Sequence, residues 1–173
     1  MDELKFAVIG DPVSHSLSPN IHHFFASQLQ LEGFSYTKIK SSKNTFQSDV
    51  DDFFKSGGIG LNVTVPFKGQ AYNLCDRLDQ SAIECKSVNT IMSHSGELMG
   101  YSTDGQGLVD DFSQKKITLE NSKVLIIGAG GSAASIISSL LLHEAAAEVS
   151  ILNRTERNAI KLLDLFKMDK LIK

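Results

Sequence analysis

The chain has few cysteines and no cluster of metal-binding side chains. Cys75 and Cys85 are its two cysteines, and they form neither a CxxC pair nor part of a group with histidines. A structural zinc site needs closely spaced ligands, and a disulfide framework needs several cysteines in a short secreted chain. The sequence therefore predicts no metal site and two reduced thiols, which are typical of a cytoplasmic protein.

Long hydrophobic runs and blocks of like charge are also missing. The first apolar run covers only Phe6 to Ile9, and the aliphatic stretch from Ala133 to Leu142 is interrupted by serines. Neither run suits a signal-peptide core or a membrane span. With 17 Lys and Arg against 20 Asp and Glu, the net charge is −3, which argues against a nucleic-acid partner and against binding to an acidic membrane surface.

Apolar runs alternate with helical patterns along the first 103 residues, which indicates layers of helices on a sheet. Ser18 is the expected N-cap of the first helix, with Pro19 as its first helical residue, and a hairpin is expected around His94-Ser95-Gly96. We therefore predict a three-layer α/β domain with a mixed sheet over residues 1–103. Its expected strands are 5–9, 34–40, 59–65, 87–92 and 97–102, and its expected helices are 18–31, 45–55, 67–74 and 79–85.

A second pattern of strands and helices follows a linking helix and loop expected over residues 104–120. Its strands are expected at 123–127 and 149–152, and its helices at 131–143 and 154–167. A doubly wound dinucleotide-binding fold has roughly six strands, so residues 121–173 are predicted to be the first half of a Rossmann-like domain in a C-terminally truncated chain. Because open strand edges invite pairing, we expect the chain to associate, for example as a homodimer, or to be partly disordered after residue 121.

A glycine-rich segment with the pattern GxGxxA lies between an expected strand and an expected helix. Gly128 allows a tight turn, Gly130 lets the backbone approach a pyrophosphate, and Ala133 keeps the helix close to the strand. The free N–H groups and the dipole at the start of that helix favour phosphate. The expected cofactor-binding residues of this loop are Gly128, Ala129, Gly130, Gly131, Ser132 and Ala133.

The next expected strand ends at Asn153-Arg154-Thr155. An NAD-selective site carries an acidic residue near this point, where it binds the ribose 2′-hydroxyl. This chain instead has Arg154, followed by Arg157 one turn later. The planar guanidinium group matches a 2′-phosphate, so the sequence favours NADP. The alternative is that these arginines are merely solvated surface charges.

Polar side chains gather in four segments at the ends of expected strands, where loops carry function. The segments are His15–Pro19, Asn62–Lys68, Val88–Thr90 and Ser102–Gly105. Their hydroxyls and amides, with one lysine and one carboxylate, suit a small polyhydroxylated acid. Lys68 and Asp104 are the plausible proton-transfer pair among them. Alternatively, the serines and Asp104 could serve only as helix caps, and Lys68 could be a solvated charge.

These motifs together resemble the shikimate dehydrogenase family, whose members reduce 3-dehydroshikimate to shikimate with NADPH. The resemblance covers the chain from Phe6 to about Ala159 and depends on the order and spacing of the motifs. They are Ser16-Leu-Ser-Pro19, Asn62-Val-Thr-Val-Pro-Phe-Lys68, Val88-Asn-Thr90, Thr103-Asp-Gly105, Gly128-Ala-Gly-Gly131 and Asn153-Arg-Thr155.

The resemblance implies a role for each matching residue. Ser16 and Ser18 would bind the substrate carboxylate. The residues that would contact ring hydroxyls are Thr64, Asn89 and Asp104. Lys68, paired with Asp104, would be the acid and base at the reacting oxygen. The 128–133 loop would cradle the cofactor pyrophosphate, and residues 153–155 would hold the adenosine 2′-phosphate. The implied activity is that of an NADP-dependent oxidoreductase of chorismate and aromatic amino acid biosynthesis.

Three departures from the family pattern and three alternatives qualify this expectation. Ser102 stands where the family usually has asparagine, Lys86-Ser87 stands where it has small residues, and Gln80 replaces a frequent acidic residue. The alternatives are a quinate/shikimate enzyme with looser cofactor use, an inactive fragment that binds shikimate, and a nucleotide-binding regulator that does not bind it.

Overall fold

The computed structural model describes residues 3–143 and 148–166. The chain forms two compact units. Unit 1 comprises the residues up to Asp79 and Val88–Tyr101, and unit 2 comprises Gln80–Ser87 and the residues from Ser102 onward. This division differs from the expected boundary at residue 103 in two ways. The segment Gln80–Ser87 joins unit 2, and so does the helix that was expected to link the two domains.

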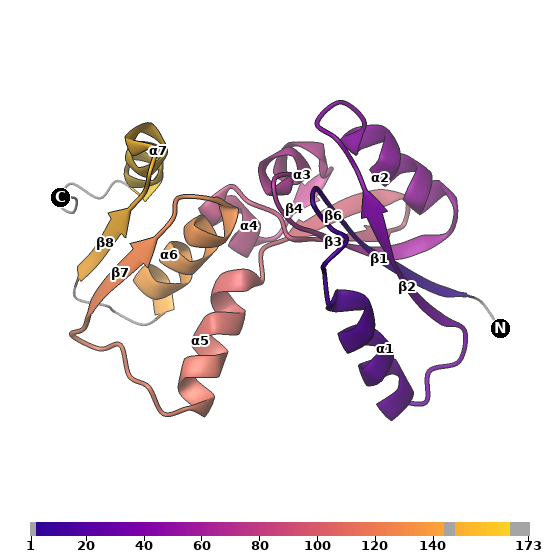
Figure 1. The fold of residues 1–173 in the computed structure, drawn as a ribbon, viewed down its shortest axis with the longest axis horizontal. Coiled ribbons are helices and arrows are strands. Elements are labelled where there is room, and N and C mark those ends of the chain that lie inside the picture. Colours follow the sequence, from indigo (N-terminus) through magenta and orange to yellow (C-terminus); the bar gives the residue numbers. More distant parts are fainter. Residues whose placement is uncertain (1–2, 144–147, 167–173) are drawn as a thin grey trace. The chain divides into compact units, whose positions relative to one another are not determined.

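Unit 1 is built on a six-stranded sheet with the strand order β2-β1-β3-β5-β6-β4 (Figure 1). Strand β1 is parallel to β2 and β3, whereas β5 is antiparallel to both β3 and β6, which confirms the expected mixed sheet. The elements of unit 1 are β1 (Leu4–Gly10), α1 (Ser18–Gln28), β2 (Phe34–Lys40), α2 (Phe46–Lys55), β3 (Gly58–Val63), α3 (Lys68–Leu74), β4 (Arg77–Leu78), β5 (Thr90–His94) and β6 (Glu97–Tyr101).

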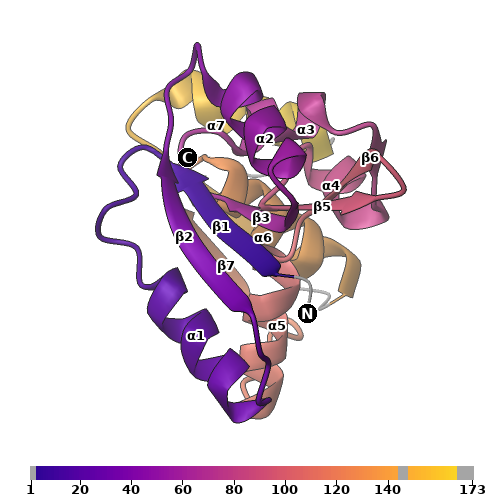
Figure 2. The same cartoon turned by 90° about the vertical axis from the view of Figure 1, so that its right-hand side faces the viewer.

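The strand order puts helices on both faces of this sheet. The chain leaves β1, pairs β2 on one side of it, and then returns to pair β3 on the other side. Since crossovers between parallel strands are right-handed, two crossovers in opposite directions cover opposite faces. Helix α1 accordingly lies on one face of the sheet, and α2 and α3 lie on the other (Figures 1 and 2). The expected three layers are therefore present.

The core of unit 1 is formed by alternating strand residues and by one helix face. Phe46, Val50 and Phe53 are the buried residues of α2, at the spacing of one helical face. The ring of Phe46 stacks on that of Phe67 with centroids 4.9 Å apart. Side chains of β1 and β2, together with Val13 from the loop after β1, form a second cluster on the sheet. Its strand members are Val8, Tyr36, Phe6 and Phe34.

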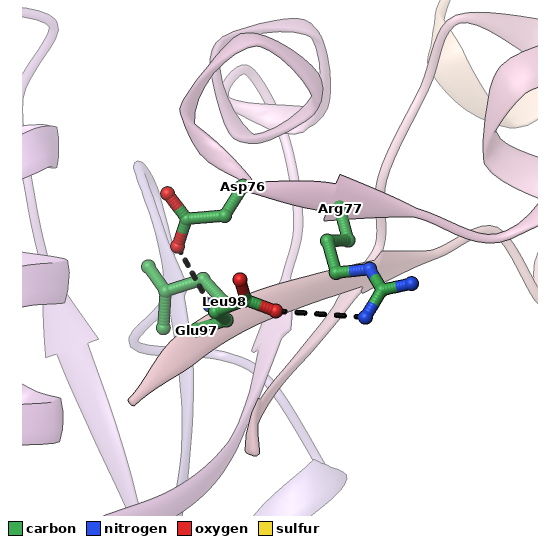
Figure 3. A network of polar contacts seen from close by, with 4 residues as sticks. All are labelled: Asp76, Arg77, Glu97 and Leu98. Carbon is green, nitrogen blue, oxygen red and sulfur yellow. Dashed lines mark hydrogen bonds and ion pairs between the residues drawn. The ribbon is translucent and has the colours of Figure 1, made fainter. Parts of the chain in front are cut away.

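The far edge of the sheet is a hairpin with a short added strand. Ser95 and Gly96 have φ angles of 53° and 84°, the left-handed values that a two-residue hairpin turn requires. Strand β4 was not expected, and polar contacts fasten it to β6 (Figure 3). The Leu98 N–H donates to Asp76 Oδ2 at 2.8 Å, and Arg77 Nη1 lies 3.6 Å from Glu97 Oε2. This ion pair is exposed, so its contribution to stability is small.

Unit 2 contains a two-stranded parallel sheet, β7 and β8, against which α6 and α7 pack (Figure 1). Helix α5 packs against α6. Alternate residues of the two strands point inward and pack against α6 and α7. They are Val124 and Ile126 of β7 and Val149 and Ile151 of β8. On the opposite face, Leu125 and Ile127 are 60% and 78% exposed. The elements of unit 2 are α4 (Gln80–Cys85), α5 (Asp104–Gln114), β7 (Lys123–Ile127), α6 (Gly131–His143), β8 (Glu148–Leu152) and α7 (Glu156–Phe166).

The expected starts of α2, α3 and α4 are each one residue early, and the starts of α1 and α7 also differ from the structure. Leu17 occupies the N-cap position of α1, and Ser18 is already its first residue. The Ser18 N–H is instead satisfied by Ser16 Oγ at 3.3 Å, so the hydroxyl that serves the helix start comes from two residues earlier. Helix α7 begins at Glu156, not at Arg154, and its expected end at residue 167 lies outside the described residues.

Candidate active site

The segment Asn62–Lys68, at the carboxyl end of β3, lies next to the loop that leaves β1 and leads to the segment His15–Pro19. The Thr64 N–H donates to Ile9 O at 3.0 Å, and the Asp11 N–H donates to Val65 O at 3.0 Å. A side chain at Gly10 would collide with Thr64, so glycine is needed for this close approach. The loop after β1 leads to α1 on one face, and the loop after β3 leads to α3 on the other. Crevices that bind ligands in α/β sheets form at such points.

Asn89 and Lys68 join the same end of the sheet through backbone hydrogen bonds. Because β5 is antiparallel to β3, the residue that precedes β5 lies beside the end of β3. The Val63 N–H donates to Asn89 O at 2.7 Å, and the Val88 N–H donates to Lys68 O at 3.1 Å. The structure thus brings the backbones of Thr64, Lys68 and Asn89 together at one end of the sheet.

The two serines of the first motif interact with each other. Ser16 Oγ donates to Ser18 Oγ at 3.2 Å, and both side chains are half-buried. The Ser18 side chain also lies close enough to the phenol of Tyr36 to oppose part of the effect of burial on the pKa of that group. The serine pair therefore lies near a third residue, which is on β2.

Tyr36 is a buried polar residue that the sequence analysis did not select. Its side chain is 5% exposed, and its hydroxyl donates to Asn62 Oδ1 at 2.6 Å. Burial raises the pKa of Tyr36 to about 12, so the phenol is neutral at pH 7. Its ring stacks on His22 with centroids 4.4 Å apart, and burial together with His23 lowers the pKa of His22. The sequence did hold a sign of this role. Tyr36 is a tyrosine at an inward-facing position of β2, and a buried tyrosine hydroxyl usually has a hydrogen-bond partner.

The side chain of Asn62 also bonds to the polar segment Val88–Thr90. Its Nδ2 donates to Thr90 Oγ1 at 3.2 Å, and the Thr90 hydroxyl donates to Asn89 Oδ1 at 3.3 Å. The Asn62 carboxamide connects β2 with the residue before β5.

Lys68 and Asp104 are each the first residue of a helix. Phe67 and Thr103 occupy the N-cap positions of α3 and α5, and neither makes a side-chain capping bond. Asp104 is therefore not the N-cap of its helix, although its negative charge suits a helix start. Lys68 has the opposite charge, which a helix start disfavours, so helix stability does not explain it. Lys68 belongs to unit 1 and Asp104 to unit 2, and their pairing stays a prediction.

Asp104 is held in unit 2 by a buried junction between α5 and α6. The Gly105 N–H and the Ser102 hydroxyl both donate to Ser135 Oγ at 2.9 Å, and Cys85 Sγ donates to Ser102 Oγ at 3.2 Å. A side chain at Gly105 would collide with the Ser135 carbonyl oxygen. Ser102, which departs from the family pattern, is therefore part of this junction and is 5% exposed.

The glycine-rich loop has the geometry expected for a phosphate site. Gly128 has a φ of +122°, which L-residues avoid, and its N–H donates to Leu152 O at 2.8 Å. A Cβ atom at Gly128 or Gly130 would meet no protein atom within 4 Å. The loop thus has an open side where phosphate could approach the start of α6. Ala133 is buried against the strands, as the motif requires.

The arginine segment lies beside this loop. Ile127 and Leu152 are partners in the parallel pair β7–β8, so Gly128 and Asn153 follow neighbouring strand ends. Asn153 Nδ2 donates to Thr155 O at 2.7 Å. Arg154 lies before α7 and Arg157 in its first turn, and both side chains are exposed. The residues present therefore fit a phosphorylated dinucleotide, with a glycine loop and adjacent guanidinium groups.

Other chemistry finds little support among the described residues. Across 3–143 and 148–166, no group of three or more His, Cys, Asp and Glu side chains is placed to hold a metal ion. Both cysteines are free. Burial raises the pKa of Cys75 to about 11 and also raises that of Cys85, so both thiols are protonated and poorly nucleophilic at pH 7. None of the helices that the structure describes is long and apolar enough to cross a membrane.

Comparison with known proteins gives matches over nearly the whole chain. The family model for the shikimate dehydrogenase substrate binding domain matches residues 8–91, and that for shikimate / quinate 5-dehydrogenase matches residues 111–173. A shikimate dehydrogenase (NADP(+)) from Acinetobacter baylyi is 42% identical over 92% of this chain. One from Alkalilimnicola ehrlichii is 43% identical over 94%. In each case the match covers 60% of the relative, so the chain spans less than two thirds of its length.

Solved structures agree with the sequence matches. Shikimate dehydrogenase from Aquifex aeolicus has a TM-score of 0.89 and 31% identity, covering 99% of this chain and 62% of that protein. Shikimate 5-dehydrogenase from Thermus thermophilus, solved in complex with NADP(H) and shikimate, has a TM-score of 0.87 and 32% identity, covering 98% and 63%. The expected α/β fold, with a substrate domain followed by part of a Rossmann-like domain, is confirmed. This chain belongs to the shikimate dehydrogenase family.

Proposed function

We propose that this chain binds shikimate or 3-dehydroshikimate at the strand ends of unit 1 and NADP(H) at the glycine-rich loop of unit 2. Its proposed activity is the NADP-dependent interconversion of shikimate and 3-dehydroshikimate. One observation carries the proposal. The segments Asn62–Lys68 and Val88–Thr90 meet at the carboxyl end of β3, where backbone hydrogen bonds bring Thr64, Lys68 and Asn89 together. Hydroxyls, a carboxamide and an ammonium group are the donors that a polyhydroxylated carboxylate needs.

The proposed mechanism assigns positioning to most residues and proton transfer to one. Ser16 and Ser18 hold the substrate carboxylate, and Asn89 and Thr64 bind ring hydroxyls. Reduction of the ring carbonyl builds negative charge on its oxygen. The Lys68 ammonium stabilises that charge and donates a proton to the oxygen, and in the reverse direction the amine accepts it. Asp104 binds a ring hydroxyl, which its carboxylate accepts as a hydrogen-bond donor.

The cofactor-binding residues act by position. NADPH, when bound, supplies the hydride for the carbonyl carbon. The N–H groups at the start of α6 face the pyrophosphate, and Arg154 with Arg157 binds the 2′-phosphate. Their guanidinium groups favour NADP over NAD because the ribose 2′-hydroxyl of NAD offers them no charge. The names of the relatives agree with shikimate as the substrate and do not favour quinate.

We further propose that the chain works in the cytoplasm and associates with a second copy. Two free, protonated cysteines suit a reducing compartment. Association is supported by exposed apolar side chains on α1 and on the open face of β7, since contiguous apolar patches mark interaction surfaces. These are Leu17, Ile21, Phe24, Phe25, Leu29, Leu125 and Ile127. Analytical ultracentrifugation tests this, and a monomer at all concentrations would contradict it.

The proposed activity is tested by NADP-dependent oxidation of shikimate, followed through NADPH absorbance, alongside calorimetry with shikimate. We expect Lys68→Ala to lower the rate by at least about 100-fold, the typical contribution of a general acid and base. Lys55→Ala, which removes an exposed lysine of α2, is the matched control. Activity that persists in Lys68→Ala would contradict the assigned role. Shikimate binding without turnover would support the alternative of an inactive fragment that binds shikimate.

A further inference from the structure

One continuous line of side-chain hydrogen bonds runs through unit 1 and ends at the proposed substrate site. We call it the Tyr36 line. It begins at the phenol of Tyr36 and ends at the asparagine that is assigned to a ring hydroxyl. Its members are Tyr36, Asn62, Thr90 and Asn89.

The chemistry of the first residue fixes the direction of each bond toward Asn89. A neutral phenol donates one hydrogen bond, and here it donates to Asn62 Oδ1 at 2.6 Å. The Asn62 carboxamide must then present Nδ2 to Thr90, whose hydroxyl accepts there and donates to Asn89 Oδ1. With its oxygen engaged, Asn89 presents Nδ2 as the donor on its other side.

The packing of the Tyr36 ring fixes the start of the line. The ring stacks on His22 with centroids 4.4 Å apart and packs with Val8 and Val13. The phenol oxygen that donates to Asn62 is therefore held in one place.

We propose that Tyr36 is a positioning residue that orients Asn89 for the substrate. The proposal depends on the proposed function and adds a residue to it. A line of half-buried hydrogen bonds that served stability alone would not need to end on a group assigned to the substrate. Preorganised donors, by contrast, bind tightly because little order is lost when the ligand arrives.

The experiment measures shikimate affinity by calorimetry on the full chain and its variants. Tyr36→Phe removes one oxygen and keeps the ring, and Thr90→Val removes the hydroxyl and keeps the shape. Each should raise the dissociation constant about five- to tenfold, the value of one hydrogen bond. Thr90→Ser restores the hydroxyl and should bind like the parent chain. Tyr72→Phe, the same change in half-buried Tyr72 of α3, is the matched control.

The double variant separates positioning from general destabilisation. Because both changes interrupt one line, Tyr36→Phe with Thr90→Val should bind no more weakly than the weaker single variant. Nitrogen-15 NMR of the ligand-free chain gives a second readout. The Asn89 side-chain amide signals should move in Tyr36→Phe and Thr90→Val but not in Tyr72→Phe.

Three outcomes would overturn the proposal. The first is a shikimate affinity of Tyr36→Phe within about twofold of the parent, which is less than half the value of one hydrogen bond. The second is a double variant in which the two losses of affinity multiply. The third is that the Asn89 amide signals stay in place in both single variants. In these cases a parent chain that binds shikimate leaves the proposed function intact. A parent chain that binds no shikimate overturns the proposed function and this role together.

Discussion

The backbone N–H of Gly105 donates to Oγ of Ser135 at 2.9 Å, which ties the residue after Asp104 to the helix that begins at the glycine-rich loop. Ser135 is 3% exposed and also accepts the Ser102 hydroxyl. One buried oxygen thus fixes the start of α5 against α6 within unit 2. The position of Asp104, the residue before Gly105, therefore depends on this junction.

Replacing Ser135 with alanine should lower stability, because it leaves two buried donors without their acceptor. We expect Ser135→Ala to reduce the free energy of unfolding by about 1–3 kcal/mol, the cost of unsatisfied buried polar groups. Urea unfolding measures this change. Ser113→Ala, at an exposed position on the same α5 helix, should change stability by less than about 0.5 kcal/mol. Equal effects of the two variants would show that the junction is unimportant.

Two glycines of the phosphate loop should respond differently to alanine. Gly128→Ala forces an L-residue to a φ of +122° and should destabilise unit 2 by about 1–3 kcal/mol. Gly130→Ala meets no protein atom, so it should leave stability nearly unchanged. It should still weaken NADP binding, because the methyl group takes the place of a phosphate oxygen. Thermal unfolding and calorimetry with NADP separate the two effects, and normal NADP affinity in Gly130→Ala would contradict the loop assignment.

Reversing the charge at Arg154 should weaken NADP binding more than NAD binding. A charge-assisted hydrogen bond to the 2′-phosphate contributes about 1.5–3 kcal/mol, so Arg154→Asp should lower NADP affinity by about tenfold or more. Lys161→Asp makes the same change in charge at an exposed position of α7 and controls for long-range effects. If both variants bind NADP like the parent chain, Arg154 does not contact the 2′-phosphate.

Stability should fall in alkaline solution. Burial raises the pKa of Cys75 from 9.0 to about 11 and that of Tyr36 from 10.0 to about 12. A raised folded pKa means that the folded state holds its proton longer than the unfolded state. The stabilisation is therefore complete below pH 9 and is lost as pH rises toward 11 and 12. Urea unfolding between pH 7 and 10.5 measures the slope, which Cys75→Ala should reduce. A stability that rises over this range would contradict the burial of these groups.

Local patterns predicted the elements whose signals lie within one stretch of chain. The bounds of β7 and α6 are confirmed, because a buried strand, a glycine turn and a helix start follow one another in sequence. Strand β4 was not predicted, because its two residues are too short a pattern and pair with β6 about twenty residues later. The neighbouring Asp76 carboxylate accepts the N–H of Leu98 on β6.

Long-range contacts explain the remaining differences. Helix α4 joins unit 2 because Cys85 bonds to Ser102, seventeen residues later. Tyr36 was missed because its partner Asn62 lies on another strand, twenty-six residues away. Motif positions could be read from the sequence, but the bonds that orient them could not.

Nitrogen-15 NMR of the chain during a shikimate titration tests the central claim most directly. The account predicts that backbone signals move at the carboxyl ends of β1 and β3 and in the segments that meet them. The expected residues are Ser16, Ser18, Thr64, Lys68, Asn89 and Asp104. Signals of β4 and of the hairpin turn at Ser95 and Gly96, at the far edge of the sheet, should stay in place. A spectrum that does not change at millimolar shikimate, or that changes only away from these strand ends, would contradict the account.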